Sequence, residues 1–168
     1  MFKKNVLIAF FLAVILILPA IKITYANNTA IDLPKTQINP GSFYYSFKRL
    51  WEKGMTILNF SEESKIPYYD SLVAIRLAEL DYVVKNKILS EIETSSQRFA
   101  YYAGTLTGEL TKLNKSDKNK QVIGKYMKYK VFLEQLRDNF PVNSSYWMLL
   151  QHDINSLDNY IEKLNKTT

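Results

Sequence analysis

The chain has 168 residues, with 22 Lys and Arg against 16 Asp and Glu, so its formal net charge is +6. It contains no cysteine, which excludes disulfides, thiol chemistry and attachment through a lipidated cysteine. Lys3, Lys4 and Lys22 lie in an N-terminal leader without acids, and removing them leaves 19 basic against 16 acidic residues. The remaining +3 does not favour a nucleic-acid partner.

Residues 1–26 have the pattern of a secretory signal peptide or of an N-terminal membrane anchor. The two early lysines precede an almost continuous apolar run over residues 6–21, and residues 24–26 (Thr-Tyr-Ala) resemble a peptidase site. The run is slightly shorter than the ~20 residues that span a bilayer. Under both interpretations we expect an extracytoplasmic chain, either secreted or tethered to the outer face of the cytoplasmic membrane. The lack of cysteine in an exported protein favours a bacterial source.

The rest of the chain divides into a tether and one helical domain. Residues 27–40 are polar, contain two prolines and lack periodicity, which predicts an extended tether. In residues 41–168 apolar side chains recur at spacings of three and four, which predicts an all-α bundle of four to five antiparallel helices. Breaks are expected at 114–117 and 141–144, whereas the helices on either side of 87–90 could also be continuous.

The densest motif is residues 40–52 (PGSFYYSFKRLWE). Pro-Gly predicts a turn, and the helix that follows gathers its apolar side chains on one broad face while its charged residues point elsewhere. We therefore expect Phe47, Leu50 and Trp51 to anchor this helix in the core of the bundle.

This motif is followed by residues 60–63 (FSEE) and by residues 76–79 (RLAE). The three elements, in this order and at these separations, resemble the bacterial domain family DUF5667, a domain of unknown function. The resemblance covers about residues 38–115, which makes residues 41–115 the DUF5667-like part of the bundle. It implies an exported or membrane-tethered bacterial protein, and it implies no catalytic or binding residues because none is established for the family.

Groups for catalysis or metal binding are few. His152 is the only histidine, and its place beside the apolar seam of its helix predicts that it faces solvent. The carboxylates show no ligand spacing, and no serine stands in a nucleophile motif. We therefore expect neither enzyme activity nor a cofactor.

A lysine-rich stretch, residues 112–130, is a candidate binding surface. Lys118, Lys120, Lys125 and Lys128 lie off the apolar seam of their helix, so we expect them to project into solvent. Such lysines are suited to an anionic lipid or a wall polymer.

Two further features bear on partners. Ala100, Gly104 and Gly108 form a small-residue stripe, which we expect to pack against a neighbouring helix, with a homodimer contact as the alternative. The 12 tyrosines suit half-buried helix boundaries or an aromatic groove for peptide or glycan.

The sequence thus predicts a helical protein-interaction or sensor-like module of the bacterial envelope with an unidentified protein partner. The alternative is an envelope-binding protein attached through its lysines.

Overall fold

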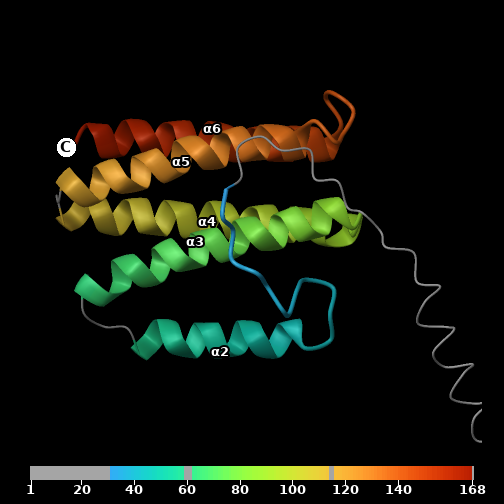
Figure 1. Ribbon diagram of the computed structural model, residues 1–168, viewed down its shortest axis with the longest axis horizontal. Coiled ribbons are helices and arrows are strands. Elements are labelled where there is room, and N and C mark those ends of the chain that lie inside the picture. Colours follow the sequence, from blue (N-terminus) through green and yellow to red (C-terminus); the bar gives the residue numbers. More distant parts are fainter. Residues whose placement is uncertain (1–30, 59–61, 114–115, 168) are drawn as a thin grey trace, which may run out of the picture.

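The computed structural model describes residues 31–58, 62–113 and 116–167, and these fold into five helices (Figure 1). The predicted signal peptide or anchor, residues 1–26, lies outside the described residues. Of the helices described, none combines the length and apolar character needed to cross a membrane. The helices are α2 (Tyr45–Leu58), α3 (Glu62–Lys85), α4 (Leu89–Leu113), α5 (Ser116–Arg137) and α6 (Ser145–Asn165).

Helices α3 to α6 form a four-helix bundle in which consecutive helices run in opposite directions (Figure 1). This confirms the predicted all-α class. α3 packs on α4, α4 on α6, and α5 on α6, with a smaller contact between α3 and α5. Helices α4 and α5 are consecutive in the chain, and a long side chain of α5 reaches across to α4. The Tyr126 hydroxyl donates a hydrogen bond to the Ala103 carbonyl oxygen at 2.8 Å.

The apolar seams that the sequence predicts form the core of the bundle. Each helix from α3 to α6 turns its seam inward, because side chains three and four residues apart lie on one face of a helix. Burying about ten such side chains at ~1.5–3 kcal/mol each supplies most of the driving force for folding. Fully buried members are Val73, Leu77 and Leu80 of α3, Ile92, Ala103, Leu106 and Leu110 of α4, Leu133 of α5, and Leu150, Leu157 and Leu164 of α6.

Helices α3 and α4 are separate, because a turn lies between Lys85 and Leu89. Lys87 has a left-handed backbone with φ of 56°. Its N–H donates to the Val84 carbonyl (3.1 Å), and the Ile88 N–H donates to the Val83 carbonyl (2.9 Å). This pair of bonds is a Schellman motif, which normally has glycine where Lys87 stands. Ile88 then packs against the core.

The other expected breaks are also confirmed. α5 begins at Ser116, and the loop before α6 ends in a cap, because Ser144 accepts a hydrogen bond from the Trp147 N–H at 3.3 Å. In the predicted tether, residues 31–36 form neither helix nor strand. They differ from a free tether, however, because Ile31 and Leu33 pack against the core.

Candidate functional site

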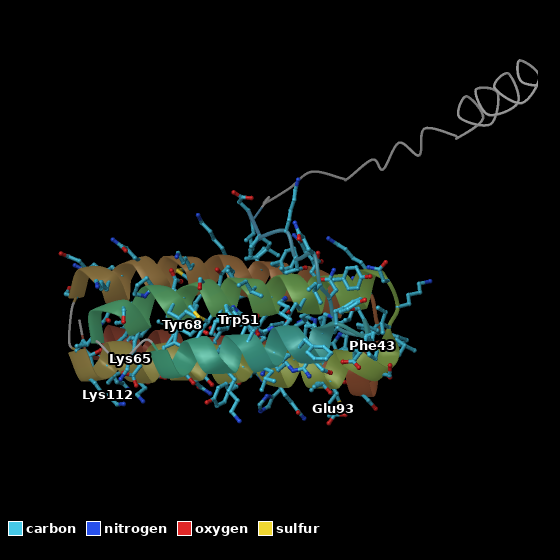
Figure 2. All side chains as sticks on the ribbon, turned by 90° about the horizontal axis from the view of Figure 1, so that it is seen from below. Phe43, Trp51, Lys65, Tyr68, Glu93 and Lys112 are labelled. Atoms are coloured by element: carbon cyan, nitrogen blue, oxygen red, sulfur yellow. The ribbon has the colours of Figure 1, made fainter. Side chains whose placement is uncertain are left out.

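Helix α2 lies outside the bundle, beside α3 and α4, and Figure 2 looks at the molecule from the side of α2 (Figures 1 and 2). The prediction that its apolar residues anchor it in the core is wrong. The exposed fractions of Phe47, Leu50 and Trp51 are 65%, 70% and 74%. The helix is inverted over residues 45–55, because Tyr45, Lys48 and Glu52 face the bundle and the large apolar side chains face outward.

The inversion is explained by a buried carboxylate on α3. Glu79 is fully buried. One of its oxygens accepts a hydrogen bond from the Tyr45 hydroxyl of α2 (2.6 Å), and the other accepts from the Lys48 Nζ of α2 (2.6 Å). The Lys48 Nζ also donates to the Ile38 carbonyl oxygen at 3.0 Å. The two α2 side chains therefore point inward to satisfy a charge that water cannot reach.

Arg76, also fully buried, completes the arrangement. Its guanidinium donates to Glu79 at 2.5 Å and, through its other terminal nitrogen, to Glu52 of α2. We call the set of Tyr45, Lys48, Glu52, Arg76 and Glu79 the polar clasp. It joins α2 to α3 by charge-assisted hydrogen bonds, which are roughly twice as strong as neutral ones.

The pKa values within the polar clasp follow from this pairing. Burial opposes the charge on Glu79, but Arg76 and the hydrogen bonds from Lys48 and Tyr45 outweigh it and hold the pKa of Glu79 below its ordinary value. Burial likewise opposes the charge on Arg76, and the carboxylates of Glu79 and Glu52 outweigh it and raise the pKa of Arg76. Both groups are therefore charged at neutral pH.

Helix α4 supports the polar clasp with aromatic and cationic contacts. The Arg98 guanidinium lies over the Tyr45 ring, 5.0 Å from its centroid, and donates to the Tyr45 hydroxyl at 3.2 Å. The Arg76 guanidinium lies 5.3 Å from the centroid of the Tyr102 ring. The Arg98–Tyr45 contact joins α4 to α2, and the Arg76–Tyr102 contact joins α3 to α4 beside the polar clasp.

Every member of the polar clasp belongs to the motifs at 40–52 and 76–79. The structure brings these two motifs together, which the sequence analysis did not predict. A signal for it was present, since Tyr45, Lys48 and Glu52 recur at i, i+3 and i+7, a polar stripe opposite the apolar one.

The outward face of α2 carries a hollow of about 840 Å³, which we call the outer hollow. Gly54 stands in the middle of this face, and a Cβ placed on it would meet no atom within 4 Å. Phe43, just before the helix, is also strongly exposed (Figure 2). The outer hollow is lined by Ile38, Phe47, Lys48, Leu50, Trp51, Gly54 and Met55.

A second cleft, of about 610 Å³, lies between α2 and the bundle. It is lined by three tyrosines and by basic and apolar side chains of α2, so it corresponds to the aromatic groove considered from the sequence. Its residues are Ser46, Arg49, Leu50, Lys53, Tyr69, Tyr101 and Tyr102.

The four lysines proposed as a binding surface lie on α5, apart from these hollows. Lys120 and Lys128 are exposed, and Lys118 is half-buried. The Lys125 ammonium pairs with Asp70 of α3. Part of the charge expected at this surface is therefore compensated within the chain.

The small-residue stripe of α4 is used inside the bundle at one of its three positions. A Cβ on Gly104 would lie 2.8 Å from the Tyr160 hydroxyl of α6, so Gly104 makes room for that ring. Ala100 and Gly108 are half-buried. Close packing against a neighbouring helix is thus confirmed at Gly104.

A buried acid that no sequence pattern indicated lies next to the histidine. His152 is exposed, as expected, but Asp153 is buried and accepts a hydrogen bond from Ser96 Oγ at 2.7 Å. Burial raises the pKa of Asp153 to about 7, although the Ser96 bond partly offsets this. Within residues 31–58, 62–113 and 116–167, no three carboxylate or imidazole side chains gather as a metal ion would require.

Comparison with known proteins adds no relative. No family model matches the chain, and searches of curated proteins and of solved structures find no match.

Proposed function

We propose that the chain is an extracytoplasmic helical interaction module of the bacterial envelope and that its contact surface is the apolar face of α2. The observation that carries the proposal is the inversion of α2. An isolated amphipathic helix on a bundle normally buries its apolar face. Here a contiguous aromatic patch faces outward, and such patches mark contact sites.

The polar clasp supports this proposal because it holds α2 in one orientation. Burying Arg76 and Glu79 is costly, and a buried ion pair often stabilises a fold no better than apolar residues of similar size would. Burial of the Arg76–Glu79 pair has a functional explanation if the pair keeps the apolar face of α2 directed outward. A surface fixed in advance loses less conformational entropy on binding, which raises affinity.

The extracytoplasmic part of the proposal is supported by the leader sequence. Attachment through the lysines of α5 is the competing mode, and it should weaken at high salt, whereas contact through the apolar face of α2 should not. The pairing of Lys125 with Asp70 favours the α2 mode.

Site-specific photo-crosslinking in the producing cell tests the proposal. A photoreactive amino acid replaces Trp51 in one variant and Met127, an exposed residue of α5, in a control variant. We expect discrete protein adducts from position 51 and none from position 127. Equal labelling at the two positions, or no protein adduct at position 51, contradicts the proposal.

A further inference from the structure

We propose that the occupant of the apolar face of α2 is a second copy of this chain. In this arrangement two α2 helices pack antiparallel about a twofold axis that passes between Trp51 and Gly54. The inference rests on the proposed function, because it names the partner of the same surface.

The apolar face of α2 carries both a projecting side chain and the space to receive one. Gly54 leaves open space above the helix backbone, since an added Cβ would meet no atom within 4 Å. Trp51, three residues earlier on the same face, is largely exposed. A twofold axis between the two positions places each Trp51 over the partner's Gly54. A surface that fits itself in this way forms a closed dimer.

The apolar residues of α2 have the spacing with which helices pack against one another. Phe47, Leu50, Trp51 and Gly54 occupy positions i, i+3, i+4 and i+7 of α2. Ridges and grooves with this spacing pack one helix against another. Because α2 lies on the outside of the bundle, a second α2 can approach this face (Figure 1).

The exposed apolar area of α2 is large enough for an interface between two copies. Large apolar side chains cover ~150–250 Å² each, so Phe47, Leu50, Trp51 and Met55 at their exposed fractions offer roughly 500 Å² per chain. A symmetric pair would bury about 1,000 Å² in total, which reaches the ~1,000 Å² expected of a specific interface. One chain alone leaves a patch at the upper end of what monomers expose.

The charge that lines the outer hollow is paired within the chain. Lys48 is the charged residue among those that line the outer hollow. Its ammonium is bound to Glu79 and to the Ile38 carbonyl oxygen. The lining therefore presents an apolar surface rather than a cation for a lipid headgroup, and such a surface is suited to the same face of another chain.

Sedimentation velocity over a range of concentrations tests the proposal on the full chain, in the form in which the cell accumulates it. We expect a reversible dimer. Gly54→Leu should abolish it, because the added side chain fills the space that the partner's Trp51 needs. Gly124→Leu is the matched control, since Gly124 is also an exposed helical glycine with open space above it. We expect it to dimerise as the parent does, and circular dichroism should show both variants fully helical.

Each alternative occupant gives a different result. A parent chain that stays monomeric at its highest soluble concentration overturns the proposal, as does a Gly54→Leu variant that dimerises like the parent. If the parent chain is monomeric and crosslinks at position 51 to a different protein, the second copy is excluded and the proposed function stands. If it is monomeric and crosslinks to no protein, both the dimer and the proposed function fail. If the monomeric parent instead binds phosphatidylglycerol vesicles, and the Gly54→Leu variant binds them more tightly than the parent does, the face is a lipid contact and the dimer is excluded.

Discussion

Replacing Glu79 with Gln should release α2 from the bundle while the bundle itself stays folded. The substitution keeps the shape of the side chain but removes the charge that accepts from Lys48, Tyr45 and Arg76. Removing one partner of a buried ion pair typically costs ~3–5 kcal/mol. Release of α2 lets water reach the cations of Arg76 and Lys48, so the cost should appear as a weaker attachment of α2 and not as unfolding of the bundle.

Hydrogen exchange and urea unfolding together measure this loss. We expect the α2 amides of Glu79→Gln to exchange about 100-fold faster or more, since each 1.4 kcal/mol is a factor of ten. The urea midpoint of the bundle should fall by a smaller amount. Glu162→Gln is the control, because Glu162 forms an exposed pair with Lys166 and should leave both measurements unchanged. Unaltered exchange of α2 in Glu79→Gln would refute the role of the polar clasp.

Three further predictions follow from single positions. Trp51→Ala should lower the stability of the dilute monomer by less than ~0.5 kcal/mol, because the side chain is exposed; a fall of several kcal/mol in thermal melting would place Trp51 in the core. Asp153 has its pKa raised to about 7, so stability should decline as the pH rises from about 4 to 7. Asp153→Asn should flatten that decline and stabilise the protein at pH 8 by on the order of 4 kcal/mol in urea titrations, whereas an unchanged pH profile would contradict the assignment. Lys87→Gly should stabilise the protein by about 0.5–1 kcal/mol because glycine adopts the left-handed conformation without strain, and a lower melting temperature would count against the turn.

Most of the bundle could be predicted from the sequence because its helices are long and their apolar spacing is regular. The seam from Ile92 to Leu110 and the seam from Val122 to Leu136 are buried as expected. The loop before α6 was also predictable, since Pro141 and Ser144 are strong stop and cap signals.

Two features could not be predicted, for physical reasons. The turn at Lys87 lacks glycine, and its left-handed backbone is held by tertiary packing of Ile88. The orientation of α2 depends on which of its two faces finds a better partner. The sequence shows an apolar stripe and a polar stripe, but the buried charges of Arg76 and Glu79 decide between them, and burial of a charge is not visible in the spacing of α3.

The fluorescence of Trp51 tests the central claim, the outward orientation of the apolar face of α2, most directly. The chain has two tryptophans, so Trp147→Phe leaves Trp51 as the only one, and Gly54→Leu in the same chain keeps it monomeric. We predict an emission maximum close to that of indole in water and full access to the quencher iodide. A blue-shifted emission that iodide cannot quench would show that Trp51 is packed inside the monomer, and it would contradict the inverted helix.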